Sequence, residues 1–420
     1  MNTMQLRQTC RVCDGELDPV LSLGDMYVSD FPAPGDPDGT LAPLDMVICR
    51  RCRLVQLRHT VSGEVMYRNY WYRSGTNQTM RDALADIAHK AETLIHLKPG
   101  DAVLDIGCND GTLLAAYDTG SITRIGFDPA ENLAQYSRQI ADHLVVGFFD
   151  ADVVEATPEL RGVRPKIVTS IAMFYDLEEP RKFVSDVRRV MDPNGLWIVQ
   201  MSWLPLMLRE HELGNLCHEH LEYYSLHSFE YLLRLEGFEV VDVEINSVNG
   251  GSIRAYIRQK SADPEAFGDA TYRQHAVSRV QAIRDQEVSL QLADNAPYEE
   301  FAFWAERIKN DVVSFIRSQV RDGKRVYVYG ASTKGNTVLQ YYGLDSSLIA
   351  AASERNADKW GRMTVGTHIP IISEEQARRD NPDFFLVLPW HFLREFMARE
   401  HEYLRAGGRF IVPAPHFALI

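Results

Sequence analysis

The sequence predicts an α/β protein in which a small, loop-rich module precedes two larger parts, each built on a parallel sheet. Strand-like and helix-like segments alternate from residue 102 to 201 and again from 325 to 412. Such alternation is typical of doubly wound sheets. Two Cys-x-x-Cys pairs lie within the first 52 residues, and a long, charged helical stretch separates the two alternating parts.

Composition narrows the class of protein. The chain has 420 residues, which favours several domains. Its net charge of −14 argues against broad nucleic-acid binding, which needs a basic footprint. No apolar run reaches the roughly 18 residues that a membrane span needs. The N-terminus lacks the pattern of a secretion signal, so we expect no membrane partner and a cytoplasmic location. Nothing in the sequence indicates the oligomeric state.

The first module, residues 1–70, contains a Pro/Gly/Asp cluster at 31–43 that disfavours regular structure. The module is too small for an independent hydrophobic core, so a bound metal ion is expected to stabilise its fold. Two pairs with the same spacing supply four thiolates, which suits a closed, structural zinc site. The predicted ligands are Cys10, Cys13, Cys49 and Cys52. Free thiols or a redox dithiol are the alternatives.

The elements of the larger parts follow from hydrophobic spacing. A helix is predicted over 78–96, and Pro99-Gly100 ends it. Strands are then predicted at 102–106, 124–127, 166–170 and 196–201, with helices at 112–117, 131–140 and 180–191. Paired strands over 238–258 turn at Asn249-Gly250-Gly251. Helices fill 263–322, and strands follow at 325–329, 349–353, 384–388 and 409–412, with a helix from about 336. The predicted domains are 1–70, 71–262, 263–322 and 323–420.

A glycine turn joins the first central strand to its helix. Asp105, Gly107, Asn109, Asp110 and Gly111 form a D-x-G-x-x-x-G pattern, not the G-x-G-x-x-G that suits a dinucleotide. The pattern resembles motif I of the class I methyltransferases, in which the turn holds the methionine and ribose parts of S-adenosylmethionine (SAM).

The segments that follow the turn fit the same cofactor. Asp128 ends the second strand, where a carboxylate can accept both ribose hydroxyls. Phe148 and Phe149 are candidates for an adenine wall, and plain core packing is the alternative for Phe148.

The segment His218-Glu219-His220 follows the strand at 196–201, so it should lie near the mouth of the SAM site. Histidine is the natural base near neutral pH, and an adjacent glutamate can orient it. A metal role and a plain surface loop are the alternatives.

These motifs together resemble the sugar C-methyltransferases, a family that builds branched deoxysugars on nucleotide carriers. The family combines a four-cysteine zinc-binding module, a class I methyltransferase domain and a C-terminal Rossmann-like domain. The resemblance rests on the order of the segments 72–75, 105–111, 218–225, 250–252, 329–336, 367–371 and 410–413.

The resemblance implies methyl transfer from SAM to a carbon beside the ketone of a nucleotide-linked keto-deoxysugar. It makes His220 the base, supported by Glu219, with His218 next in line, and it places Tyr72 and Tyr224 near the sugar. The remaining implied contacts to the sugar nucleotide are Gly330, Ser332, Lys334, Asn336 and Arg254.

Four segments depart from the family pattern: Cys217, Asn249, His391 and, after the strand predicted at 166–170, Phe174-Tyr175-Asp176. O-methyl transfer or methylation of another polar metabolite therefore remains open. So does a protein that binds a sugar nucleotide without methylating it.

Overall fold

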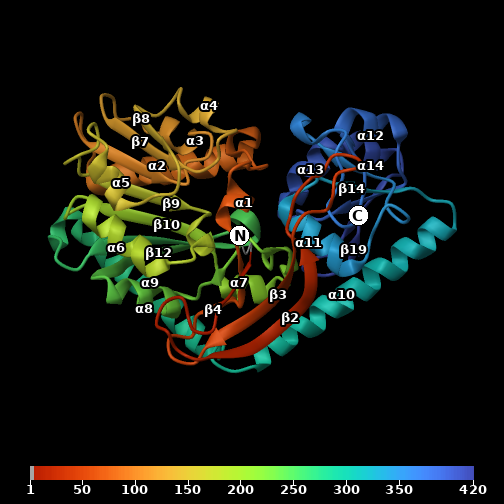
Figure 1. The fold of residues 1–420 in the computed structure, drawn as a ribbon, viewed down its shortest axis with the longest axis horizontal. Coiled ribbons are helices and arrows are strands. Elements are labelled where there is room, and N and C mark those ends of the chain that lie inside the picture. The colour runs from red at the N-terminus through yellow and green to blue at the C-terminus, as the bar shows by residue number, and fades with distance from the viewer. Residues whose placement is uncertain (1–3) are drawn as a thin grey trace.

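The structure, a computed structural model, describes residues 4–420 apart from the side chain of Val65. Figure 1 shows two sheet-based parts, a central one in orange to green and a C-terminal one in blue. Two long N-terminal strands run beneath both parts, and the helix α10 (Ala296–Arg321) runs along the lower edge of the C-terminal part.

The central part is built on a seven-stranded sheet in the order β12-β13-β10-β9-β6-β7-β8. Its strands are β6 (Ala102–Ile106), β7 (Thr123–Asp128), β8 (His143–Val146), β9 (Ile167–Ile171), β10 (Leu196–Ser202), β12 (Phe238–Asn246) and β13 (Ser252–Gln259). Strands β6 to β10 are parallel, and β13 is antiparallel to both of its neighbours. The predicted doubly wound sheet is confirmed.

Helices cover both faces of this sheet: α2 (Gln78–Ile95), α3 (Thr112–Ala115), α4 (Ala134–Ser137), α5 (Ala151–Ala156), α6 (Pro180–Val190) and α8 (Leu226–Leu235). The Asn77 side chain caps α2 by accepting a hydrogen bond from the Thr79 amide, and α2 ends where His96 turns left-handed. The helix predicted over 131–140 is wrong in length, because only the short α4 forms there.

The C-terminal part has a six-stranded sheet in the order β16-β15-β14-β17-β18-β19. The strands are β14 (Val326–Tyr329), β15 (Ala351–Glu354), β16 (Ile371–Ser373), β17 (Phe384–Val387), β18 (Arg409–Val412) and β19 (Ala418–Leu419). All are parallel except β19. The associated helices are α11 (Thr333–Tyr342), α12 (Glu374–Asp380), α13 (Leu393–Arg399) and α14 (His401–Arg405). The predicted Rossmann-like unit is confirmed, and α9 (Ala270–Ser289) and α10 connect it to the central part.

The N-terminal residues contain more strand than predicted. β2 (Leu17–Tyr27) and β3 (Leu41–Cys49) form a long antiparallel pair, and the Pro/Gly/Asp cluster forms most of their connection. β4 (Val55–Leu57) pairs with β3 and also with β11 (Glu222–Tyr223), a strand from the central part. β1 (Met4–Leu6) pairs with β5 (His59–Val61), and α1 (Gly63–Tyr67) follows.

The N-terminal module shares its core with both larger parts. Cys10, Cys52 and Leu54 pack into the apolar cluster of the central part, whereas Met26 and Phe31 pack into that of the C-terminal part. The module therefore acts as a brace between two sheets.

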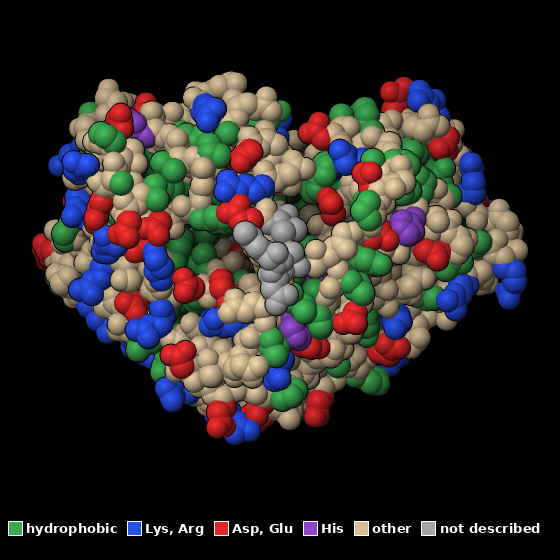
Figure 2. Space-filling view, in the orientation of Figure 1, with side chains coloured by type: hydrophobic (Ala, Val, Ile, Leu, Met, Phe, Trp, Pro, Cys, Tyr) green, Lys and Arg blue, Asp and Glu red, His purple; other side chains and the backbone are tan. Residues whose placement is uncertain are grey.

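None of the helices in residues 4–420 is both long enough and apolar enough to cross a membrane. On the face shown in Figure 2, lysine and arginine side chains lie interspersed with aspartate and glutamate.

Candidate active site

A cavity of about 330 Å³ lies between the central and C-terminal parts. Residues at the carboxyl ends of β6, β7 and β9 line one side, and the start of α11 lines another. Both β6 and β14 have a parallel neighbour on either side, so the chain order reverses at each. Ligands of open α/β sheets bind at such switch points. The fold therefore turns the binding ends of two sheets toward one cavity.

The glycine turn after β6 lines the cofactor side of this cavity. Gly107 has φ +77°, and a Cβ there would lie 2.9 Å from Met173 Cγ, so the position requires glycine. Asn109 also lines the cavity. Asp110 and Gly111, also predicted as cofactor contacts, are not among the residues that line it. The Asp110 carboxylate instead accepts a hydrogen bond from the Gly75 amide at 2.9 Å, and Gly111 begins α3.

The two acids predicted for the cofactor differ in their surroundings. Asp105 lies at the cavity wall and accepts a 2.6 Å hydrogen bond from the Thr169 hydroxyl, and burial raises its pKa to about 7. Asp128 accepts from the amides of Asn109 and Ala130, both at 2.8 Å, and burial raises its pKa to about 6. Asp128 ends β7 at the cavity, where a carboxylate suits ribose hydroxyls, whereas Asp105 braces β6 against β9.

Phe148 and Phe149 have different surroundings. Phe148 lines the cavity with 45% of its surface exposed, so it has a free face for a flat ring. Phe149 packs edge-on against Phe127 and Phe183, with ring centroids 5.3 and 5.5 Å apart. Phe149 also lines the cavity, so its ring has both a core-packing side and a side toward the cavity. The glycine cradle, the strand-end carboxylate and the free ring together fit SAM.

Residues 70–76, here called the strap, close the cavity beside the glycine turn. The Asn109 side chain accepts from the Ser74 amide at 2.9 Å and donates to the Tyr72 carbonyl at 3.1 Å. At its other end the strap meets the C-terminal part, where Asn356 donates to the Trp71 carbonyl at 3.3 Å. The strap carries Tyr70 and Tyr72 into the cavity.

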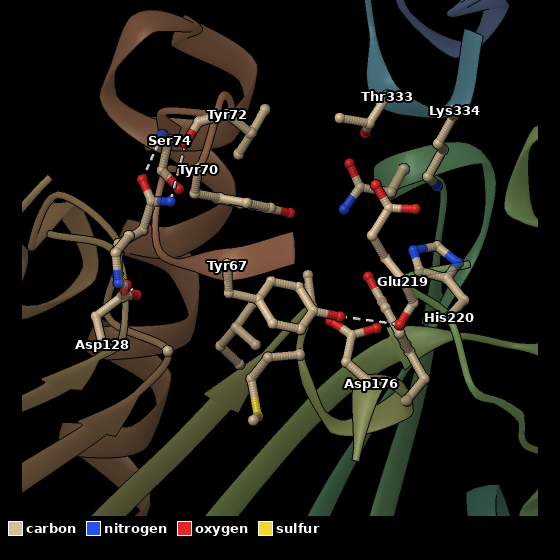
Figure 3. Close-up of a pocket in the computed structure, with 18 of the residues that line it drawn as sticks. Tyr67, Tyr70, Tyr72, Ser74, Asp128, Asp176, Glu219, His220, Thr333 and Lys334 are labelled. Carbon is tan, nitrogen blue, oxygen red and sulfur yellow. Dashed lines mark hydrogen bonds between the residues drawn. The ribbon is translucent and has the colours of Figure 1, made fainter. Parts of the chain in front are cut away.

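His220 lies on the opposite side of the cavity from the glycine turn (Figure 3). Its Nδ1 donates to the Asn215 carbonyl at 2.9 Å, because a carbonyl can only accept. The proton therefore sits on Nδ1, and Nε2 is left with a free lone pair. Burial lowers the pKa of His220 well below its usual value. The Tyr175 ring packs against the imidazole, with centroids 4.3 Å apart.

Glu219 also lines the cavity, and burial raises its pKa. The Tyr67 hydroxyl donates to the Glu219 carbonyl at 3.0 Å, which ties α1 to the histidine segment (Figure 3). The surface-loop alternative for this segment is wrong, because His218, Glu219 and His220 are all buried.

Two residues of this region lie outside the cavity, contrary to prediction. His218 points to the N-terminal sheet, where its Nε2 donates to the Ala42 carbonyl at 3.0 Å. Tyr224 is fully buried and packs against Phe174 and Phe229. These contacts hold both side chains away from the cavity wall.

The C-terminal wall is formed by Ser332, Thr333, Lys334 and Gly335. The Ser332 hydroxyl accepts from the Gly335 amide at 3.0 Å and so caps α11. Lys334 bonds to the Asn215 side chain and is the only lysine or arginine among the described residues that line the cavity.

The other predicted substrate contacts lie elsewhere. Asn336 donates to the Ser29 hydroxyl at 2.9 Å and joins the C-terminal part to the N-terminal module. Arg254, on β13, donates to Gln200 at 2.9 Å and to Asp86 at 2.6 Å, outside the cavity. Gly330, with φ +87°, makes the turn before α11 but does not line the cavity. In this structure, Asn336, Arg254 and Gly330 therefore do not lie with the predicted substrate contacts Ser332 and Lys334 at the cavity wall.

Several cavity residues escaped the sequence reasoning as site residues: Tyr67, Tyr70, Tyr175, Asp176, Glu212, Cys217 and His391. A signal existed for Asp176, because it lies a few residues beyond the carboxyl end of β9. Tyr175, Cys217 and His391 carry a signal as departures from the family pattern, whereas Tyr67, Tyr70 and Glu212 reach the cavity only through tertiary contacts.

The four predicted zinc ligands meet at one point. Their sulfur atoms lie within 4.8 Å of one another, with Cys10 and Cys52 at 3.5 Å and Cys13 and Cys49 at 3.4 Å. A tetrahedral zinc–sulfur centre with bonds of about 2.3 Å has sulfurs about 3.8 Å apart, so the set fits. A Cβ on Gly15 would lie 2.8 Å from Cys49 Sγ, so only glycine fits beside the cluster. The sulfurs form a closed structural zinc site.

Family profiles cover most of the chain. A C-methyltransferase C-terminal domain matches residues 247–415, a methyltransferase domain matches 72–243, and a zinc binding domain matches 10–67. Among solved structures, the PH0226 protein from Pyrococcus horikoshii OT3 is 17% identical, with 45% of this chain and 95% of that chain covered and a TM-score of 0.36. The magnesium protoporphyrin IX methyltransferase from Synechocystis PCC 6803, with bound SAM, is 15% identical, with 43% and 79% covered and a TM-score of 0.31.

C-methyltransferase NovU from Streptomyces niveus is 33% identical over 411 residues, which are 97% of this chain and 95% of NovU. The match thus extends over nearly the whole length of both chains. The chain therefore belongs to the family of SAM-dependent C-methyltransferases.

Proposed function

We propose that this enzyme transfers the methyl group of SAM to a carbon beside the ketone of a nucleotide-linked keto-deoxysugar, with His220 as the base. One observation carries the proposal. The hydrogen bond from His220 Nδ1 to the Asn215 carbonyl leaves Nε2 unprotonated in a cavity whose other side fits SAM. A neutral imidazole with a fixed ring is suited to removing a carbon-bound proton.

The C-terminal wall supports a phosphorylated substrate. The start of α11 faces the cavity and offers backbone N–H groups, and Lys334 adds a positive charge. Helix N-termini and a nearby lysine are a common combination for phosphate groups. The strap tyrosines, Tyr70 and Tyr72, supply aromatic and hydroxyl surface between this wall and the glycine turn.

The residues of the chain take part in one proton transfer. His220 Nε2 accepts the proton from the carbon next to the ketone, and the resulting enolate carbon is the nucleophile. SAM supplies the methyl group. Burial favours the neutral base before the reaction, and the Asn215 carbonyl stabilises the imidazolium that forms.

The test compares His220→Ala with His401→Ala, a matched change at an exposed histidine. His220→Ala should lower methyl transfer by roughly 100-fold or more, as expected for a lost general base, while SAM affinity stays within about twofold. Assays use a panel of dTDP- and GDP-linked 4-keto sugars, with mass spectrometry for transfer and proton NMR for the position of the methyl. Near-normal turnover of His220→Ala, or a methyl group on oxygen, would overturn the proposal.

A further inference from the structure

The cavity contains carboxyl groups that the proposed chemistry does not yet use. Asp176, Glu212 and Glu219 each have one side-chain oxygen that is buried and has no hydrogen-bond partner in the structure. All three line the cavity. An unpaired buried oxygen is costly, so such groups are expected to meet a ligand or to carry a proton.

Asp176 stands out among the three by its position. It ends the short helix η2 (Phe174–Asp176), directly after β9. Tyr67, Tyr175 and Glu219 surround it, and Figure 3 shows its carboxyl group beside the hydroxyl end of Tyr67, facing His220 and Glu219. No hydrogen bond or ion pair to the side chain of Asp176 is found among residues 4–420 apart from Val65.

The surroundings of Asp176 favour a neutral carboxyl group. Burial and the neighbouring carboxyls of Glu219 and Glu222 raise its pKa well above the usual value, and the charge of Lys334 opposes them only in part. Lys334 is committed to the Asn215 side chain. A carboxylic acid that an enclosed site keeps neutral at pH 7 can donate a hydrogen bond to a developing oxyanion.

We propose that Asp176 is the acid that binds the carbonyl oxygen of the keto substrate. The inference rests on the proposed function, because it assumes a ketone in the cavity. As His220 Nε2 takes the proton, the C–H electron pair forms the new carbon–carbon double bond and the carbonyl π pair moves to oxygen. The Asp176 O–H donates to that oxygen and keeps its proton, so the carbonyl reforms when the carbon is alkylated.

This assignment gives a physical reason for two departures from the family pattern. The acid stands in the segment after β9, where this chain departs from the family pattern, and Cys217 leaves no strong donor immediately before the histidine segment. A thiol is a weak hydrogen-bond donor. The proposed oxyanion donor is therefore the carboxyl group of Asp176, which follows β9, and not the side chain at position 217.

The experiment separates enolate formation from methyl transfer. Protein and dTDP-4-keto-6-deoxyglucose are mixed in D₂O with S-adenosylhomocysteine, which cannot give a methyl group, and NMR follows exchange of the hydrogens beside the ketone. Asp176→Ala should slow exchange by roughly 100-fold or more, the cost of losing one oxyanion donor, whereas Asp176→Asn, which keeps an N–H donor, should lose only about tenfold. Binding of the dTDP-sugar, measured by calorimetry, should change by less than about threefold for Asn.

The outcomes are distinct. If the wild-type protein exchanges no hydrogen of any keto sugar in the panel, the proposed function fails. If the wild type exchanges and Asp176→Ala exchanges at the same rate, the role of Asp176 fails and Tyr72→Phe becomes the next variant. Equal losses for Ala and Asn, with unchanged folding by circular dichroism, would also overturn the proposal, since a hydrogen-bond donor would then not be the property required.

Discussion

At the scale of single residues, burial changes the pKa of the aspartates that line the cavity. Asp105 and Asp128 lie on adjacent parallel strands, and both line the cavity. Asp105 is occupied by the Thr169 hydroxyl. Burial raises the pKa of both acids, to about 7 for Asp105 and to about 6 for Asp128.

SAM affinity should therefore depend on pH through Asp128. Its pKa in the folded protein is about 6, raised by burial, so it is protonated below that value. A protonated carboxyl accepts ribose hydroxyls poorly, and binding must then expel a proton. Affinity should fall by up to about tenfold for each pH unit below 6 and stay level above it. Calorimetry from about pH 5 to pH 8 measures this. Asp128→Asn should bind weakly at every pH, and a slope that persists in that variant would assign the titration to another group.

At the scale of elements, the strap is the piece that connects the two binding halves. Asn109 and Asp110 hold its one end through Ser74 and Gly75, and Asn356 holds the other through Trp71. The Asn109 backbone amide also donates to Asp128. A ligand that binds Asp128 therefore affects Asn109, the residue that also positions the strap.

Gly75→Ala should loosen the strap without touching a ligand. Its Cβ would lie 2.7 Å from Asp110 Oδ2, so the carboxylate must move and its hydrogen bond to the strap weakens. We expect a stability loss of about 1–2 kcal/mol and faster amide exchange over residues 72–76. Gly120→Ala, where no atom lies within 4 Å of the new Cβ, is the control and should change neither. Unchanged exchange in Gly75→Ala would show that Asp110 does not hold the strap.

Sequence reasoning succeeded where structure is local. Strands β6, β9, β10 and β18 lie within one residue of their predicted bounds, because alternating strand and helix patterns depend on neighbouring residues. The N-terminal strands were missed because the Pro/Gly/Asp cluster between β2 and β3 indicated loop, and because β4 pairs with β11, more than 160 residues further along the chain. The resemblance placed Asn336 and Arg254 near the ligand by position in a motif, whereas each is occupied by a structural contact. Asp176 acquires its chemistry only from burial, which sequence does not show.

At the scale of the whole molecule, the zinc site supports the brace between the two sheets. The four cysteines fix the turns from which β3 and β4 extend, and these strands contact both larger parts. Metal binding in such a small module contributes directly to folding, because the unfolded chain has no formed site.

Zinc removal should therefore lower both stability and activity. We expect one zinc per chain by elemental analysis, and a chelator should lower the unfolding temperature by roughly 5 °C or more. Cys13→Ser should behave like the chelated protein, and added zinc should restore the chelated wild type but not the variant. Full activity and an unchanged unfolding temperature after complete removal of zinc would contradict the brace.

The pairing of β11 with β4 has a consequence for exchanging parts between relatives. β11 begins two residues after the proposed base, and its Glu222 lies 3.7 Å from the guanidinium of Arg11, which stands between two zinc ligands. In a hybrid of two relatives joined near residue 70, the module that carries Arg11 and β4 would come from one protein and the segment that carries Glu222 and His220 from the other. Mismatched contacts between the two would then shift the position of His220. Productive crossovers should instead carry the segment around 203–225 together with the N-terminus, so that the two stretches are inherited as one unit.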